Sequence, residues 1–272
     1  MSSAYSGALV NKCQPATARP AGACTPEQPA QVDRRSALIS FRTTTDDQIQ
    51  IADWAGAAGA LSAPLAPWRT FRWWYGQQHY SGTYWAKTQN GHVIYESRLE
   101  LARLLYADFE TSVTAIAAQP FLIEADVDGK RRRHIPDFLL GSRTGPVVID
   151  VKPRRRVTAP KVAYTLAWTR RLVEDLGWHY EVWSEPPPIE LENIRFLAGY
   201  RDERRINGGV LNALSRNDVE GLSIEQAIAV HADLPGPLVR AALCHLLWCG
   251  AISTDLDVAL RSTAVLRKGA TS

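Results

Sequence analysis

Two carboxylates and a lysine lie close together in the sequence, on segments with the character of β-strands. Asp150 and Lys152 are two positions apart in the run 147–152, which is rich in β-branched residues. Because side chains alternate along a strand, both would point to the same face. Pro136-Asp137 lies a short hairpin upstream, so Asp137 can converge on the same place. Two carboxylates and an ammonium group at the rim of a sheet can hold Mg²⁺ and activate water for phosphodiester hydrolysis.

The spacing of these residues predicts a division of roles. Mg²⁺ prefers oxygen ligands and is usually held by one or two carboxylates together with waters and phosphate oxygens. We expect Asp137 and Asp150 to be metal ligands, with the backbone carbonyl of Val151 as a further one. Lys152 would lower the pKa of the attacking water or stabilise negative charge in the transition state. The alternative is an ion pair between two strands at the surface.

A further carboxylate is expected from a helix upstream. The apolar spacing in 95–108 predicts a helix, on which Glu96 and Glu100 would be one turn apart. Glu100 falls beside Leu104 at the edge of the apolar face, so it is predicted to lean over the rim of the sheet. Glu96 would point further into solvent. The alternative for either glutamate is an ordinary solvated charge.

Basic residues surround the proposed acidic site. The net charge is only +3, but residues 130–161 contain ten Lys or Arg residues against Asp137 and Asp150. Such a field attracts the phosphate backbone of a nucleic acid, although a charge run can also be a solvated face. The candidate DNA contacts are Arg154, Arg155, Arg156, Arg133 and His134. His134 could also shuttle a proton or be a partly exposed strand residue.

The chain divides by composition into three parts. Residues 1–45 are rich in Ala, Ser, Thr, Pro and Gln and are expected to form a disordered or loosely attached arm. Residues 46–188 alternate helical and strand patterns, which predicts an α/β domain with a mixed sheet flanked by helices. Residues 189–272 predict a small α-rich domain. A winged-helix arrangement is expected there, because the alternating stretch 254–266 follows the helices; a docking or dimerisation bundle is the alternative.

Within the α/β domain the elements follow a definite order. The aromatic-rich segment 67–85 is expected to pack a strand pair onto the core, with a base-stacking surface as the alternative. Asp128-Gly129 is a hairpin-turn signal. After the helix at 95–108, the predicted elements are strands at 113–123, 133–140 and 147–152, a helix at 162–176 and a strand at 180–183.

These motifs together resemble the TnsA-like transposase endonuclease subunits of the PD-(D/E)xK nuclease superfamily. The resemblance covers roughly residues 65–265, and the order and spacing of its short motifs make it specific. The family combines a restriction-endonuclease-like catalytic domain with a winged-helix-type domain. The residues that carry the resemblance are Tyr95-Glu96-Ser97-Arg98-Leu99-Glu100, Gln119-Pro120, Ile135-Pro136-Asp137-Phe138-Leu139 and Ile149-Asp150-Val151-Lys152-Pro153.

The resemblance implies roles for four residues. Glu100 corresponds to the helix carboxylate, Asp137 to the principal metal-binding aspartate, Asp150 to the second ligand and Lys152 to the catalytic lysine. Many members of the family have Glu or Gln at the position of Asp150. The family further implies Mg²⁺ as the cofactor, with Mn²⁺ as a substitute, and cleavage of the 5′ strand of duplex DNA at transposon ends. The implied partners are a DDE-type transposase and an AAA+ regulator.

Two other functions remain open from the residues. One is a stand-alone restriction or repair nuclease, and the other is an inactive DNA-binding assembly module. The intact acid-acid-lysine set argues against the second, because mutually repelling carboxylates would have no reason to persist. No apolar run approaches the length of a membrane span, and no Cys pair has zinc-site spacing. A cytoplasmic protein without a membrane partner is therefore expected.

Overall fold

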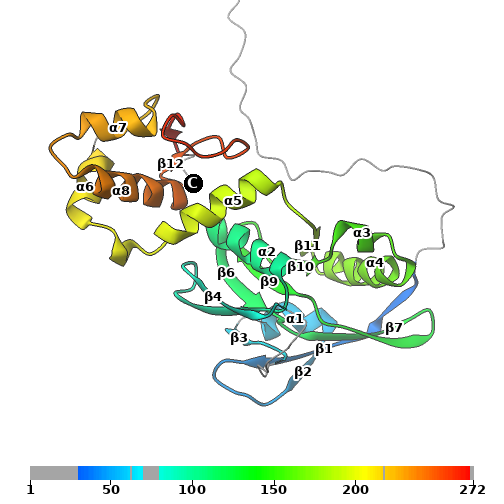
Figure 1. Ribbon diagram of the computed structural model, residues 1–272. Helices are drawn as coiled ribbons and strands as arrows, with labels where there is room; N and C mark the ends of the chain where they lie inside the picture. The colour runs from blue at the N-terminus through cyan, green and yellow to red at the C-terminus, as the bar shows by residue number, and fades with distance from the viewer. Residues whose placement is uncertain (1–29, 62, 70–79, 217, 270–272) are drawn as a thin grey trace, which may run out of the picture.

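The structure is a computed structural model that describes residues 30–61, 63–69, 80–216 and 218–269 (Figure 1). An α/β region built on two sheets occupies the lower part of the view. A group of short helices stands at its upper left, joined to it through α5 (Pro188–Leu197). Among the described residues, no helix is long and apolar enough to cross a membrane.

The central sheet is mixed, as predicted. Its strand order is β11-β10-β9-β6, with bounds His179–Trp183, Val147–Val151, Phe138–Ser142 and Val113–Ala118. Strand β10 pairs in parallel with β11 and antiparallel with β9. Helices cover both faces: Ile149 of β10 lies in one apolar cluster with α2 (Arg98–Phe109), and Val148 lies in another with α4 (Pro160–Asp175). The alternation of side chains along β10 therefore separates the two cores.

A second sheet packs below the first and includes part of the expected arm. Its order is β2-β1-β7-β8, with bounds Gln50–Asp53, Val32–Thr43, Leu122–Val127 and Lys130–His134; β3 (Leu65–Ala66) also pairs with β1. The expectation of a loosely attached arm is thus wrong for β1, whose Ile39 is completely buried. Hydrogen bonds to β7 hold β1 in the sheet, and composition alone could not predict this pairing. The remainder of the expected arm, 1–29, lies outside the described residues.

The strand expected at 133–140 is two strands in different sheets. Strand β8 ends at His134, and β9 begins at Phe138 in the central sheet. The link 135–137 crosses between the sheets, with Pro136 buried. The predicted turn at Asp128-Gly129 is confirmed, because both residues have positive φ angles, 50° and 72°, which suit a tight hairpin.

The helix expected at 95–108 begins later than predicted. Tyr95 ends strand β5 (Gly91–Tyr95), which pairs with β4 (Gly82–Ala86). Ser97 caps α2 by accepting a hydrogen bond from the backbone N–H of Glu100. Glu96 therefore lies in the turn before the helix, and the two glutamates do not share a helical face.

Tyr84 of the aromatic segment 67–85 is buried, in keeping with a packing role. Residues 70–79 of this segment lie outside the described part of the chain.

The C-terminal region is helical as predicted, and a short strand pair accompanies its helices. Strands β12 (Ile252–Ser253) and β13 (Arg267–Lys268) pair with each other, and the chain between them contains no strand. The winged-helix assignment therefore remains a prediction. The helices of this region are α6 (Gly208–Arg216), α7 (Ile224–Val230) and α8 (Gly236–Trp248). Short elements elsewhere are α1 (Ala57–Ala60), α3 (Arg154–Val157) and 3-10 turns at Trp54–Gly56, Ala198–Tyr200 and Glu203–Arg205.

The apolar core runs across the proposed boundary near residue 188. Leu104 and Ile149 of the α/β region belong to the same buried cluster as Leu197 and Leu243 of the C-terminal region. The ring of Phe109 at the end of α2 packs against Trp248 of α8, with centroids 5.3 Å apart. The helical region is thus fixed to the sheet by packing, in addition to its covalent link.

Candidate active site

Asp137 and Lys152 meet where the link between the sheets passes the end of β10. The Lys152 ammonium donates to Asp137 Oδ2 at 2.8 Å and to the Val151 carbonyl at 3.1 Å. The backbone N–H of Val151 donates to the same Asp137 oxygen at 2.6 Å. Asp137 is held in place by its own N–H, which donates to the Ile149 carbonyl at 3.0 Å. The local fold therefore fixes this carboxylate against β10, at the position that the sequence predicted.

Asp150 lies beside this pair but is completely buried. His134 Nε2 donates to its two oxygens at 2.9 and 2.8 Å, and the Tyr180 hydroxyl also donates to Oδ2. Lys152 Nζ is 3.7 Å from Asp150 Oδ1. The His134 ring packs edge-on against Trp168. His134 thus holds Asp150 inside the site. Its contact with DNA remains a prediction.

Glu100 caps its own helix and still faces the site. Its Oε1 accepts from the Ser97 hydroxyl at 2.9 Å, and its Oε2 accepts from the backbone N–H of Glu96 at 2.7 Å. These bonds turn the carboxylate back toward the start of α2. The Asp137 charge acts on Glu100 from the facing link. Glu96, the other candidate carboxylate, accepts from the Gln119 amide at 2.7 Å.

Burial and charge shift the four titratable groups in different directions. Burial, with the Asp137 charge, raises the pKa of Glu100 to about 7, and burial also raises the pKa of Asp137. Burial opposes the charged forms of Asp150 and Lys152 as well. The hydrogen bond and charge of His134 nevertheless hold the pKa of Asp150 below its usual value, and Asp137 and Asp150 raise the pKa of Lys152. Glu100 and Asp137 thus resist ionisation, while Lys152 beside them stays protonated.

The donor set fits a hard divalent cation. Within the described ranges, no group of three or more His, Cys, Asp or Glu side chains is arranged to chelate a metal. Mg²⁺ needs only one or two carboxylates, because waters and substrate phosphates complete its shell. Asp137 and Glu100 offer oxygen atoms and repel each other, and a cation would relieve that repulsion. Asp150 and the Val151 carbonyl already accept hydrogen bonds from His134 and Lys152. Each would have to give up such a bond to become a ligand of the cation.

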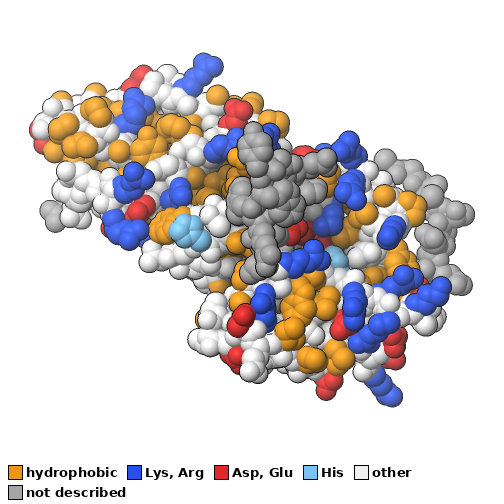
Figure 2. Space-filling view, turned by 60° about the horizontal axis from the view of Figure 1, so that its bottom comes forward, with side chains coloured by type: hydrophobic (Ala, Val, Ile, Leu, Met, Phe, Trp, Pro, Cys, Tyr) orange, Lys and Arg blue, Asp and Glu red, His pale blue; other side chains and the backbone are white. Residues whose placement is uncertain are grey.

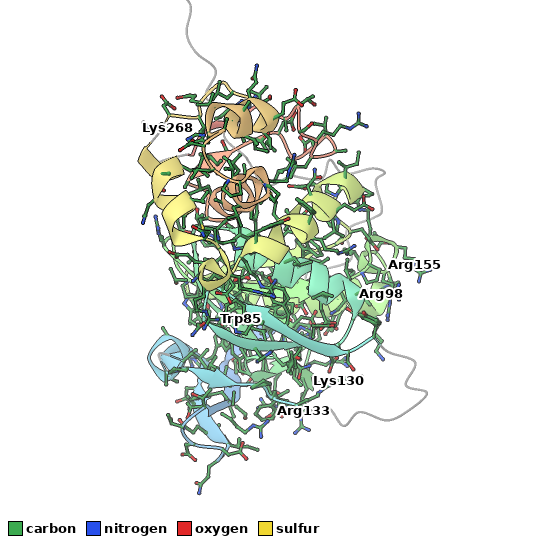
Figure 3. All side chains as sticks on the ribbon, turned by 60° about the vertical axis from the view of Figure 1, so that its left-hand side comes forward. Trp85, Arg98, Lys130, Arg133, Arg155 and Lys268 are labelled. Carbon is green, nitrogen blue, oxygen red and sulfur yellow. The ribbon has the colours of Figure 1, made fainter. Side chains whose placement is uncertain are left out.

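The predicted basic contacts differ in their surroundings. Arg154, Arg155 and Arg156 form the exposed helix α3 directly after the site, and the Arg154 guanidinium donates to the Glu185 carbonyl at 3.1 Å. Arg133 is exposed but paired with Glu124 on the neighbouring strand. Figure 2 shows Lys and Arg side chains over both halves of the face in view, with acidic side chains between them. In Figure 3, Arg155 lies at the right edge of the view, and Arg133 lies lower and nearer the middle.

Sequence reasoning did not assign a site role to Gln119 or Tyr180. Tyr180 donates to Asp150 from the neighbouring strand β11, a pairing that sequence distance hides. Gln119 belonged to one of the motifs that carried the family resemblance. Its position directly before Pro120 was the only sequence feature that marked it as a possible site residue. Its backbone N–H donates to the Asp137 carbonyl at 2.9 Å.

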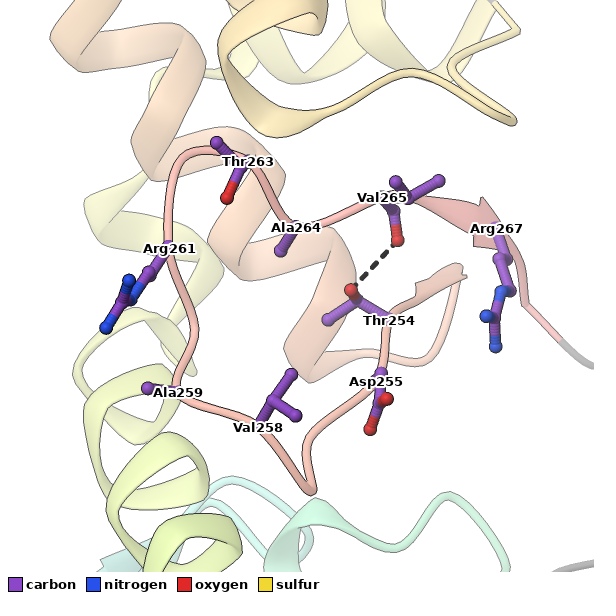
Figure 4. A pocket seen from close by; sticks show the side chains of 9 residues that line it. All are labelled: Thr254, Asp255, Val258, Ala259, Arg261, Thr263, Ala264, Val265 and Arg267. Carbon is purple, nitrogen blue, oxygen red and sulfur yellow. Dashed lines mark hydrogen bonds between the residues drawn. The ribbon is translucent and has the colours of Figure 1, made fainter.

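A separate hollow in the C-terminal region contains little that could do chemistry. It has a volume of about 450 Å³ and is enclosed by the loop between β12 and β13 (Figure 4). The Thr254 hydroxyl donates across it to the Val265 carbonyl at 2.9 Å. Asp255 is its sole carboxylate, so the candidate active site remains the cluster at the end of β10.

The mixed sheet and its acid-acid-lysine cluster define an α/β domain with a nuclease-type site. Residues 110–185 match the family described as TnsA-like endonuclease N terminal. The resemblance expected from the motifs to TnsA-like endonucleases is therefore confirmed over this range. The matched range contains Asp137, Asp150 and Lys152 and ends before the C-terminal helices; Glu100 lies outside it. No curated protein matches the chain.

Proposed function

We propose that the protein is a divalent-metal-dependent DNA endonuclease that acts as a subunit of a heteromeric transposase. The observation that supports this most directly is the contact of Lys152 with Asp137 at 2.8 Å, inside a TnsA-like endonuclease domain. Mg²⁺ is the proposed ion, held by Asp137 and Glu100, with Asp150 and the Val151 carbonyl as further oxygen donors. The proposed reaction is hydrolysis of the 5′ strand at transposon ends.

We assign different roles at a scissile phosphate to Lys152, Asp137 and Asp150. A bound divalent ion would polarise a phosphoryl oxygen and lower the pKa of a coordinated water. Lys152 carries a raised pKa, so it serves as a positive charge toward the phosphate rather than as a base. Asp137 aims this ammonium group through its hydrogen bond. Asp150, held by His134 and Tyr180, supplies a fixed negative charge behind Lys152.

Duplex DNA and a second protein complete the proposal. Arg154, Arg155 and Arg156 project from the end of β10 that carries Lys152, where they could hold the phosphate backbone. The family implies a transposase partner, which we propose to be of the DDE type, with an AAA+ regulator as a further component. The C-terminal helices, packed on α2 through Trp248, are the proposed contact for partner or DNA.

Strand cleavage by two variants tests this function. The substrate is an end-labelled transposon-end duplex, incubated with the partner transposase and Mg²⁺. We expect Asp137→Ala and Lys152→Ala each to lower the cleavage rate at least about 100-fold. Asp137→Ala removes a proposed ligand of the divalent ion, and Lys152→Ala removes a positive charge beside the reacting phosphate. Lys161→Ala, an exposed lysine nearby, is the matched control and should cut normally.

The label and the omission of the partner separate the alternatives. Label on the 5′ strand reports which strand is cut. Cleavage without the transposase would favour a stand-alone nuclease. Normal cleavage by either site variant, with circular dichroism showing a native fold, would contradict the site assignment.

A further inference from the structure

Gln119 has a strained backbone next to the candidate active site. Its φ angle is 45°, in the left-handed region that residues other than glycine seldom adopt. It also precedes Pro120, and residues before proline favour extended conformations. Its N–H donates to the Asp137 carbonyl, and its carbonyl accepts from the Trp68 N–H, each at 2.9 Å. Strain that is held in place by a site residue is a mark of a functional position.

The hydrogen bond to Glu96 fixes the orientation of the Gln119 side-chain amide. The nitrogen Nε2 is 2.7 Å from Glu96 Oε1. A carboxylate accepts hydrogen bonds and an amide nitrogen donates them, so the nitrogen end must face Glu96. The oxygen Oε1 is therefore the end of the amide that points elsewhere.

That oxygen is buried without a donor. Gln119 is 7% exposed, and Oε1 has no hydrogen-bond partner among the described residues. Arg103 Nε is the other buried side-chain atom of this kind in the described chain, but its guanidinium is already paired with Glu181. A buried acceptor without a partner is costly and indicates a water or an ion that would satisfy it.

The surroundings of Gln119 select a cation. Glu96 accepts from its amide, and the Glu96 N–H in turn donates to Glu100 at 2.7 Å. Asp137 contacts its backbone and is close enough to act on Glu100 by charge. The amide thus contacts the Glu96 carboxylate directly, and its neighbours Glu96 and Asp137 link it to Glu100 and to the candidate site. An unpartnered carbonyl oxygen in such acidic surroundings is the kind of neutral ligand that divalent cations take from Asn and Gln.

We propose that Gln119 Oε1 is a neutral oxygen donor to the hydrated divalent cation of this site. This inference rests on the proposed function and adds a residue to it. Gln119 would then connect the two halves of the site, because its side chain orients Glu96 and its backbone holds Asp137.

Calorimetric titration of Mn²⁺ without DNA tests the proposal independently of cleavage. We expect Gln119→Met to weaken Mn²⁺ binding about 10- to 100-fold, the usual loss when a partner around a metal site is removed. Asp137→Asn should abolish binding. Gln48→Met, the same change at an exposed position, should bind as wild type does. Without Mn²⁺, Gln119→Met should melt close to the wild-type temperature, because it removes the unpartnered oxygen but also the hydrogen bond from Nε2 to Glu96.

The outcomes separate this proposal from the proposed function. Wild-type Mn²⁺ affinity in Gln119→Met, together with loss in Asp137→Asn, overturns the role of Gln119 alone. No Mn²⁺ binding by folded wild-type protein overturns both. If Gln119→Met does not fold, Gln119→Asn replaces it, since Asn tolerates positive φ and its carbonyl is one methylene shorter. Wild-type affinity in that variant likewise overturns the proposal.

Discussion

The candidate active site and the C-terminal region share one apolar core, but they differ in whether their buried polar groups have hydrogen-bond partners. In the C-terminal region, Asn193 of α5 is buried and donates to the carbonyls of Leu256 and Val258, each at 2.8 Å. Its Oδ1 accepts from the Leu260 N–H at 3.0 Å. In the active site, Gln119 Oε1 has no donor among the described residues, and Glu100 faces another carboxylate.

This difference separates buried polar groups that stabilise the fold from buried polar groups that lack a partner until a ligand binds. A buried amide with its hydrogen bonds made fixes a loop in one conformation. A buried amide with an unpartnered oxygen, beside repelling carboxylates, lowers the stability of the protein by itself. Such local conflict is expected where a site is built for a ligand. The comparison therefore predicts opposite responses to removing polar groups in the two regions.

The largest expected effect is loss of stability from Asn193→Ala. The substitution breaks three hydrogen bonds between α5 and the loop 254–266 and leaves two carbonyls and an N–H without partners. We expect unfolding free energy to fall by about 3 kcal/mol, measured by urea denaturation. Glu192→Ala, its exposed neighbour on α5, should change stability little. Equal losses in both variants would contradict a specific role for Asn193.

A smaller, pH-dependent effect of opposite sign is expected from Glu100→Gln. A carboxyl with a folded pKa of about 7 keeps its proton where the unfolded chain has already lost it. Metal-free wild type should therefore lose stability as pH rises from about 4.5 to above 7. Because Glu100 is partly exposed, we expect a gain of only about 1–2 kcal/mol for the Gln variant at pH 8, after discounting for screening.

Denaturation curves at pH 5 and pH 8 test the prediction for Glu100. The advantage of Glu100→Gln should disappear at pH 5, where both proteins carry an uncharged group. Glu192→Gln, at an exposed position of α5, is the matched control. A Gln variant that is less stable than wild type at both pH values would show that the capping hydrogen bonds of Glu100 outweigh the repulsion.

The smallest expected effect concerns DNA affinity. The double variant Arg155→Gln, Arg156→Gln should weaken duplex binding about three- to tenfold and reduce the salt dependence of binding by about one to two phosphate contacts. Arg143→Gln, in the turn at the opposite end of β10, should leave both unchanged. Fluorescence anisotropy across a salt series measures both quantities. An unchanged salt slope in the double variant would remove α3 from the proposed DNA surface.

Much of the local structure followed from short patterns. The β-branched run 147–151 forms an inner strand of the central sheet, and Asp128-Gly129 makes the hairpin between β7 and β8 of the second sheet. Both features depend on local backbone preferences. The failures involve neighbours that are distant in sequence. Strand β1 was expected to be an unstructured arm, yet it pairs with β7 about ninety residues away. The strand expected at 133–140 crosses between two sheets, which local periodicity cannot express.

The sequence by itself determined the chemical types in the site and the order of its elements. Asp137, Asp150 and Lys152 could be selected because alternation along a strand and a short hairpin constrain them locally. Only the tertiary structure decided what each group faces: His134 and Tyr180 on Asp150, Glu100 turned toward its own helix cap, and Gln119 with an unpartnered oxygen. The reason is physical, since burial and hydrogen-bond partners depend on segments brought together across the fold.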